Sequence, residues 1–417
     1  MSKIDSRQID FKFAYYSGDR KTGNINIVER KNGDTKIHEI SQANDKSENE
    51  LPDILLGVSE TNQVVLLEPI GKEIKLSSEF PANAFAAHKY TDEKQNVDWY
   101  MNDGDKQTGN DTLNCGDSGS SVTVIKNADS SKAEFLKTIC VGRGHHQANY
   151  SFPSDACPDT PNQTYISNLK DGTISVIAND PSNTQSYLNV IKTIDLCEPD
   201  KEDSIETTIP NNAFPHGLVF SPVSGKVYNL NNGYGTVTII NPKTHDIESR
   251  IEFKGHSNLF LSINGQYVIG RGADRKSNNE HVLAKLSVLD VTDNTVVDSI
   301  DIPDIYISKY FFNPEGTRLY LTTSSSGSDK QQENLKTDAL LIFDMTSLPR
   351  LNMINEVRLG ASAGTLDFVT DNLGKTSLVF ASLAASGKVA VMDIDGHLLE
   401  DINIGEKVAH SRLWCLS

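Results

Sequence analysis

Short runs in which apolar and polar residues alternate recur along the whole chain of 417 residues. Each run follows a polar turn, and alternation with a period of two predicts a β-strand with one buried face. Eight such runs are present, at residues 22–29, 61–68, 118–126, 171–178, 234–241, 283–290, 337–344 and 386–393. No segment shows a convincing helical period, so the pattern predicts an all-β protein.

Each run belongs to a predicted unit of four strands. Most runs follow a second strand-like segment, and sequences such as YISNLKDGTISVIA and YNLNNGYGTVTIIN predict β-hairpins with two-residue turns. An outer strand follows the hairpin, and an apolar inner strand precedes it. The unit recurs roughly every 40 to 60 residues, which is typical of a β-propeller, where radial packing leaves few exposed sheet edges. We therefore predict a single domain, residues 1–417, with eight blades.

The two ends of the chain favour a closed ring. Residues 408–417 have the pattern of an innermost strand with no hairpin after it, and residues 11–29 predict a hairpin with no inner strand before it. Pairing of the terminal strands would complete one blade. The unit around Gln63 is less regular, because residues 41–53 contain no evident inner strand. Seven blades plus an irregular hairpin are therefore the alternative.

Residues 215–251, PHGLVFSPVSGKVYNLNNGYGTVTIINPKTHDIESRI, are the clearest copy of the repeat. This segment resembles the YVTN-repeat and haem d1-type β-propeller superfamily in its order of inner strand, SPVSG turn, hairpin and closing strand. The resemblance extends in weaker form over almost the whole chain. The superfamily includes surface and periplasmic binding proteins, haem d1 proteins and copper oxidoreductases, so the resemblance implies the fold and leaves the function open.

Charge and composition narrow the range of partners. The chain has 39 Lys and Arg against 56 Asp and Glu, a formal charge of -17, which disfavours nucleic acid and anionic membranes as partners. No run of 18 apolar residues predicts membrane insertion. We expect a periplasmic or secreted protein, with the cytoplasm as the alternative, although no signal segment begins the sequence. The five cysteines lack CxxC spacing and allow one or two disulfides.

Six of the ten histidines fall where a predicted inner strand begins. Inner strands border the central channel of a propeller, so these positions should converge on one mouth of that channel. The six are His88, His145, His146, His216, His256 and His410, and two further units carry Lys309 and Thr365 at the comparable place. Converging imidazoles are typical ligands of copper, zinc or iron. The structural alternative is that each histidine bonds the backbone of a neighbouring blade.

Copper is the metal that this pattern favours, because the histidines recur without paired cysteines or an HExxH motif. The expected ligands are His88, His146, His216, His256 and His410, with His145 orienting a ligand or the substrate. The pattern resembles the histidine-lined channels of copper propellers such as nitrous oxide reductase and thiocyanate dehydrogenase. Lys309 and Arg143 would serve catalysis by attracting an anionic substrate.

Haem d1 is the alternative cofactor at the same mouth. One histidine would bind its iron, while Arg143, Arg271, Lys309 and Arg412 would pair with its carboxylates. The absence of CxxCH excludes a covalently attached c-type haem within this chain.

Two functions from different classes follow from these hypotheses. The first is a copper-dependent oxidoreductase that acts on a small inorganic molecule, with a redox partner protein. The second is a non-enzymatic binding or scaffold propeller in which the histidines hold the blades together. Separately, Asp103 and Asp105 belong to a long acidic loop that offers oxygen ligands for calcium, although a solvated acidic loop without a metal is the favoured interpretation, because the EF-hand order is missing. Residues 324–338 predict an exposed flexible loop.

Overall fold

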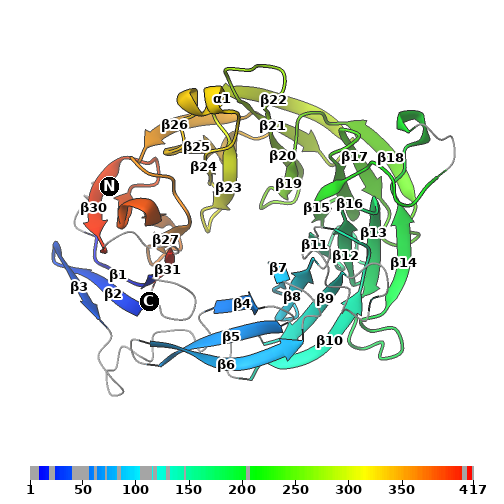
Figure 1. Ribbon diagram of the computed structural model, residues 1–417, viewed down its shortest axis with the longest axis horizontal. Helices are drawn as coiled ribbons and strands as arrows, with labels where there is room; N and C mark the ends of the chain where they lie inside the picture. The colour runs from blue at the N-terminus through cyan, green and yellow to red at the C-terminus, as the bar shows by residue number, and fades with distance from the viewer. Residues whose placement is uncertain are drawn as a thin grey trace.

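The computed structural model is an all-β structure whose sheets are arranged around a central axis (Figure 1). It describes residues 9–17, 24–39, 56–60, 63–70, 73–81, 86–103, 115, 120–127, 132–144, 147–202, 207–405 and 411–415. The predicted β-propeller fold is confirmed. Among the described residues, no helix has the length and hydrophobicity of a membrane span.

Six of the sheets contain four strands that follow one another in sequence order across the sheet. The first three are β7–β10 (Ala86–Asp92, Val97–Asn102, Ser121–Lys126, Glu134–Cys140), β11–β14 (Ala148–Ser151, Gln163–Asn168, Thr173–Ala178, Val190–Asp195) and β15–β18 (Pro215–Ser221, Lys226–Asn231, Thr236–Ile240, Ile247–Glu252). The next three are β19–β22 (Asn258–Leu261, Tyr267–Asp274, Leu283–Asp290, Thr295–Pro303), β23–β26 (Ile307–Phe312, Arg318–Thr323, Ala339–Asp344, Asn352–Arg358) and β27–β30 (Leu366–Thr370, Thr376–Leu383, Lys388–Met392, Leu398–Asn403). In each of these sheets the first strand lies nearest the centre of the ring (Figure 1).

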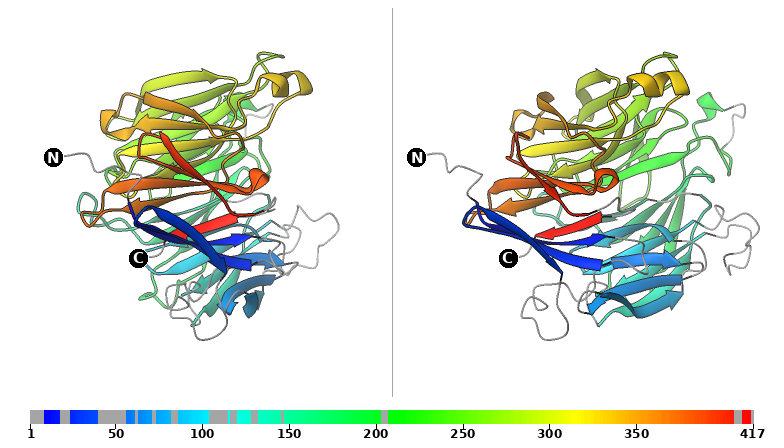
Figure 2. Two further views of the ribbon diagram at one scale, coloured as in Figure 1. Left: turned by 90° about the vertical axis from the view of Figure 1, so that its left-hand side faces the viewer. Right: turned by 60° about the vertical axis from the view of Figure 1, so that its left-hand side comes forward.

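The seventh sheet has seven strands and contains both ends of the chain. Its strands are β31 (Ser411–Cys415), β1 (Phe11–Ser17), β2 (Asn24–Lys31), β3 (Asp34–Glu39), β4 (Leu56–Glu60), β5 (Gln63–Ile70) and β6 (Glu73–Pro81). Strand β31 pairs antiparallel with β1, and Figure 2 shows the last strands of the chain beside the first. A single residue pair, Asn24 with Glu73, joins β2 to β6. The sheet therefore consists of a four-stranded part and a three-stranded part.

Neighbouring sheets pack face to face through the apolar side chains that alternate along their strands. Between β19–β22 and β23–β26, the core includes Ile269 and Phe343, both fully buried. The last sheet, β27–β30, packs in the same way on β1 and β2, where the ring centroids of Phe380 and Phe13 lie 4.9 Å apart. Burial of each large apolar side chain contributes about 1.5–3 kcal/mol, so these interfaces hold the ring together.

A β-bulge recurs where the outermost strand of a sheet pairs with its neighbour. The seven register shifts lie at Leu66/Leu67, Phe135/Lys137, Val176/Ile177, Ile239/Ile240, Val288/Leu289, Ile342/Phe343 and Val391/Met392. A bulge bends and twists a strand, which makes an exposed edge a poor template for pairing with another chain. The structural repeat therefore includes this bulge as well as the regular strand pairing.

Two local predictions from the sequence are wrong. The hairpin turns at 169–172, 232–235 and 384–387 contain four residues and end on Gly172, Gly235 and Gly387, which have φ of 68°, 67° and 64°. The stretch 324–338 contains a short helix, α1 (Asp329–Asn334). The helix begins with a capping box, in which the Ser328 side chain and the Gln331 side chain each accept a hydrogen bond from the other residue's backbone N–H, and Gln331 is only 2% exposed.

Candidate functional site

Three of the residues singled out in the sequence lie at interruptions near the start of an innermost strand. The pairing register shifts between Ala86 and His88 on β7, across His216 on β15, and across Lys309 on β23. A bulge at this point changes the direction in which the side chain leaves the sheet. The structure thus places His88, His216 and Lys309 at or within register shifts near the start of three different innermost strands.

Side chains on or beside this end of the innermost strands bond the backbone of the next sheet along the ring; His216 and Lys309 lie on innermost strands, and Arg271 lies on β20, opposite the start of β19. His216 Nδ1 lies 2.7 Å from the carbonyl oxygen of Ser257, and because a carbonyl only accepts, Nδ1 carries the proton. Arg271 Nη1 donates to the carbonyl of Ile307 at 3.2 Å, and Lys309 Nζ donates to that of Gly364 at 2.9 Å. For His216, this contact is the one that the structural alternative predicts.

His256 lies inside the wall of the ring, at only 8% exposure. Its imidazole stacks on the ring of Phe253, with centroids 4.1 Å apart, and Nδ1 donates to the Phe253 carbonyl at 3.2 Å. The pKa of His256 is lowered to about 4, chiefly by burial; the Phe253 carbonyl opposes this effect, the Lys285 ammonium adds to it, and Asp301 opposes it. His256 is therefore neutral at pH 7, and its Nε2 has no hydrogen-bond partner among the described residues.

The described part of the chain does not assemble the predicted copper cluster. No group of three or more His, Cys, Asp or Glu residues with metal-binding geometry occurs within it. In both His216 and His256, Nδ1 donates to a backbone carbonyl, which leaves Nε2 as the nitrogen suited to a metal. Within the described residues, neither imidazole belongs to a group of three or more metal-binding side chains. Three of the candidates, His145, His146 and His410, lie outside the described residues.

The other residues singled out in the sequence, two arginines and two aspartates, lie in different parts of the structure. Arg143 is paired with Asp171, through its Nε at 2.7 Å and its backbone N–H at 2.7 Å, so its charge is compensated within the fold. Arg412 is on β31, paired with Tyr16, and its side chain lies outside the described part. Of the calcium candidates, Asp103 is fully buried, and Asp105 lies outside the described residues.

A group of cationic and aromatic side chains, the Arg271 cluster, consists of Arg271, Tyr306, Lys309 and Tyr310. Arg271 bonds the backbone of β23–β26, while the Lys309 ammonium extends to the Gly364 carbonyl before β27. Within the described residues, neither Arg271 nor Lys309 forms a salt bridge, and Arg271 Nε has no partner at all. Burial lowers the pKa of both cations, because a charge with reduced hydration is disfavoured. The Arg271 cluster therefore holds two positive charges without a carboxylate.

The aromatic members of the Arg271 cluster give it a rigid wall. Tyr310 stacks on Phe260 of the preceding sheet, with ring centroids 4.4 Å apart, and it remains 37% exposed although it lies on an innermost strand. The phenols of Tyr310 and Tyr306 lie close enough to Arg271 to counteract part of the fall in its pKa. Tyr310 and Asp103 also raise the pKa of Tyr90, on β7, after the larger effect of burial. Side chains from distant sheets thus approach the same region.

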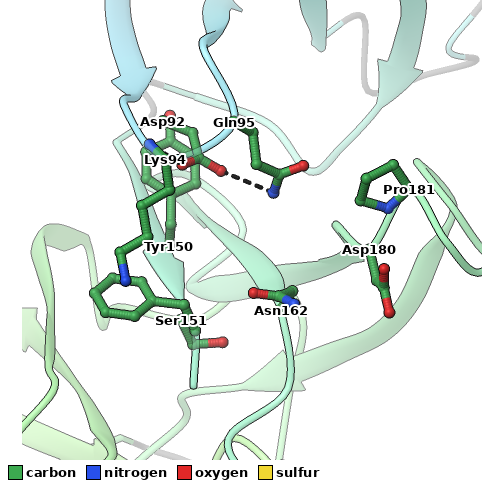
Figure 3. Close-up of a pocket in the computed structure, with 9 residues that line it drawn as sticks. Asp92, Lys94, Gln95, Tyr150, Ser151, Asn162, Asp180 and Pro181 are labelled. Atoms are coloured by element: carbon green, nitrogen blue, oxygen red, sulfur yellow. Dashed lines mark hydrogen bonds between the residues drawn. The ribbon is translucent and has the colours of Figure 1, made fainter. Parts of the chain in front are cut away.

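Two cavities lie near candidate side chains. The larger, of about 650 Å³, lies beside the Arg271 cluster and is lined by residues of 255 and 273–276 and by residues of 326–328 and 331–332. The smaller, of about 270 Å³, lies between β7–β10 and β11–β14 (Figure 3).

Several polar groups of the smaller cavity already have partners in the protein, although the Tyr150 hydroxyl has none among the described residues. Figure 3 shows Gln95 bonded to Asp92, which also accepts from Asn179 of the adjacent sheet at 2.9 Å. The ammonium of Lys94 lies 3.3 Å from the ring centre of Phe152. This cavity is built to join two sheets, so the Arg271 cluster with the larger cavity is the better candidate site.

The sequence reasoning missed the aromatic part of this site. Tyr306 and Tyr310 flank the candidate Lys309 in the segment YISKY, and this aromatic–basic pattern was the available signal. Arg275 was missed because it only reaches the site through a contact with another sheet, at Ser326.

Comparisons with known proteins give information on the fold. No protein-family model matches the sequence, and no curated protein matches it either. Similar solved structures include the periplasmic gluconolactonase PpgL of Pseudomonas aeruginosa, with a TM-score of 0.53, 10% identity, and coverage of 97% of this chain and 99% of that one. Apo AztD from Citrobacter koseri has a TM-score of 0.52 and 13% identity, with coverage of 98% and 99%. At this level of identity the likeness is one of fold, and it supports the assignment of this chain to the β-propellers.

Proposed function

We propose that this protein binds a small acidic molecule at the Arg271 cluster. One observation carries the proposal: Arg271 and Lys309 come from neighbouring sheets and have no carboxylate partner among the described residues. Arg271 is partly buried, whereas Lys309 is exposed. A partly buried guanidinium is costly unless it is paired, so an anionic ligand would supply the partner that Arg271 lacks among the described residues.

The hydrogen-bonding capacity of the two cations supports this proposal. A guanidinium has five N–H donors and an ammonium has three, whereas a single carbonyl bond is found for each of Arg271 and Lys309. Donors therefore remain for a carboxylate or a phosphate, which bind guanidinium groups in a bidentate manner. The overall charge of -17 disfavours anion binding to most of the protein surface. An anion that binds at all is therefore expected to bind at a specific positive site.

The copper oxidoreductase remains a prediction that rests on His88, His145, His146 and His410. His216 and His256 would contribute to it only through Nε2. Haem d1 is compatible with the proposed site in one respect, since its carboxylates are anions that Arg271 and Lys309 would bind. An absorption spectrum and a metal analysis of untagged protein test both cofactors.

We also propose that residues 1–417 form one closed domain of eight blades. In this arrangement the seven-stranded sheet counts as two blades, since a single residue pair joins its two parts. Export from the cytoplasm is supported by the Cys115–Cys140 disulfide, because such bonds persist mainly in oxidising compartments.

Thermal unfolding in the presence of anions tests the proposed binding function. Phosphate, succinate, citrate and D-galacturonate are the probes, each added at low ionic strength. We expect at least one of them to raise the melting temperature, and we expect Lys309→Gln to weaken its binding about tenfold or more, because a hydrogen bond to a charged group contributes about 1.5–3 kcal/mol. Lys375→Gln is the matched control. Lys375 lies in the turn between β27 and β28, at the opposite end of these strands from Gly364, which Lys309 contacts. If no probe stabilises the protein, or if both variants respond as the native protein does, the proposal fails.

A further inference from the structure

The larger cavity lies at the end of β20, the strand that carries Arg271. Its volume is about 650 Å³, and it opens between residues 273–276, at the end of β20 and just after it, and residues 326–332, before and within α1. The first segment belongs to β19–β22 and the second to β23–β26, so the cavity lies across the sheet boundary that the bond from Arg271 to Ile307 also crosses.

Gln331 fixes these two segments relative to each other. Its Nε2 donates to the carbonyls of Arg275 at 3.0 Å and Asn278 at 2.7 Å, while its Oε1 accepts from the backbone N–H of Ser328 at 2.9 Å. The side chain is 2% exposed, so water does not compete for these bonds. The walls of the cavity are consequently preorganised, which lowers the entropic cost of binding a ligand.

Arg275 and Lys276 give the cavity a positive wall. Arg275 Nη1 donates to Ser326 Oγ at 2.9 Å, and its Cζ lies 5.5 Å from the ring centre of Tyr306. Neither Arg275 nor Lys276 takes part in a salt bridge within the described part of the chain. Asp274, the carboxylate of this wall, accepts from the Ser277 side chain and from the backbone N–H groups of Ser277 and Lys276, and these bonds lower its pKa.

Tyr306 connects this wall to the Arg271 cluster. Arg271 lies on β20, and Arg275 directly follows the last residue of that strand. Arg275 Cζ lies 5.5 Å from the centre of the Tyr306 ring, and the Tyr306 phenol also raises the pKa of Arg271 against the larger effect of burial, so both guanidinium groups lie in the neighbourhood of this side chain.

We infer that the cavity is a second subsite for the same ligand, and that this ligand is an acidic oligosaccharide with at least two carboxylates. One carboxylate binds Arg271 and Lys309, and another binds Arg275 and Lys276. Hydroxyl and amide groups line the cavity between them, including Ser326, Ser328 and Gln332, and such groups both donate to and accept from sugar hydroxyls. This inference rests on the proposed function, since the first carboxylate uses that site.

Calorimetry with galacturonic acid and trigalacturonic acid tests the inference. The monomer carries one carboxylate and reaches one subsite, whereas the trimer is long enough to reach both. We expect the native protein to bind the trimer at least tenfold more tightly than the monomer, because a second charge-assisted contact contributes about 1.5–3 kcal/mol. Arg275→Gln should remove this advantage, and Lys375→Gln should keep it.

The outcomes separate the two proposals. Equal affinity of the native protein for monomer and trimer, with both weakened by Lys309→Gln, overturns the second subsite and leaves the first in place. A trimer advantage that persists in Arg275→Gln also overturns the second subsite. Binding of neither saccharide overturns the acidic oligosaccharide, while the response to phosphate, succinate and citrate still tests the proposed function. The folding of Arg275→Gln is checked by its melting temperature, which should stay near the native value because Arg275 is exposed.

Discussion

Replacing His256 by Phe should remove an acid-sensitive element from the wall of the ring. His256 is 8% exposed and stacks on Phe253, and burial lowers its pKa to about 4. In the unfolded chain its pKa returns to about 6.5. As the pH falls below 6.5, the unfolded state takes up a proton that the folded state refuses, so stability is lost between pH 6.5 and pH 4.

The expected magnitude follows from the two pKa values. Between pH 7 and pH 5, a histidine with a folded pKa of about 4 should lower the free energy of unfolding by about 2 kcal/mol. His256→Phe keeps an aromatic ring against Phe253 and has no proton to bind. Its stability at pH 7 should change by about 1 kcal/mol, because the bond from Nδ1 to the Phe253 carbonyl is lost.

Urea unfolding of both proteins at pH 7 and pH 5 measures this difference. The native protein should lose about 2 kcal/mol more than His256→Phe on acidification. His397→Gln is the matched control, since His397 is 72% exposed, and its loss should equal that of the native protein. The same loss in His256→Phe as in the native protein would refute the assignment of His256 as a buried, neutral group.

Two further predictions concern the backbone and the disulfide. Gly172→Ala should destabilise the protein by more than about 2 kcal/mol, because φ is 68° and the added Cβ would lie 1.9 Å from Asn211 Oδ1. Gly374→Ala is the control and should cost only about 1 kcal/mol, because φ is similar, at 72°, but no atom lies within 4 Å of the added Cβ. Equal effects of the two substitutions on thermal unfolding would contradict this prediction. Cys140→Ser should lower stability by about 2–4 kcal/mol through loss of the bond to Cys115, across 25 residues, and a reducing agent should have the same effect on the native protein only.

The sequence repeat made the fold predictable, but it did not predict where the individual strands end. Alternation with a period of two locates strands such as β13 and β17, although in the structure every residue of both strands is buried. It does not determine how far the pairing extends toward Gly172, and the predicted two-residue turn became a turn of four. The helix α1 was missed although Ser328 and Gln331 have the spacing of a capping box, because the segment between them is polar.

The candidate site was predictable in position and not in role. The sequence located His216 and Lys309 at the starts of inner strands, but whether such a side chain bonds a metal or a carbonyl depends on the neighbouring sheet. His216 bonds Ser257, which lies 41 residues further along the chain. The approach of Tyr306 to Arg271 likewise depends on the angle between two sheets. Local sequence patterns contain no information on such contacts.

The central claim is that Arg271 and Lys309 form a site for an anion, and comparison of a charged ligand with its neutral counterpart tests it most directly. Calorimetry of the native protein with D-galacturonate and with D-galactose at low ionic strength measures how much the carboxylate contributes to the binding free energy. We expect galacturonate to bind at least tenfold more tightly, since a charge-assisted hydrogen bond contributes about 1.5–3 kcal/mol, and we expect added salt to weaken its binding. Equal affinity for the two sugars would contradict the claim.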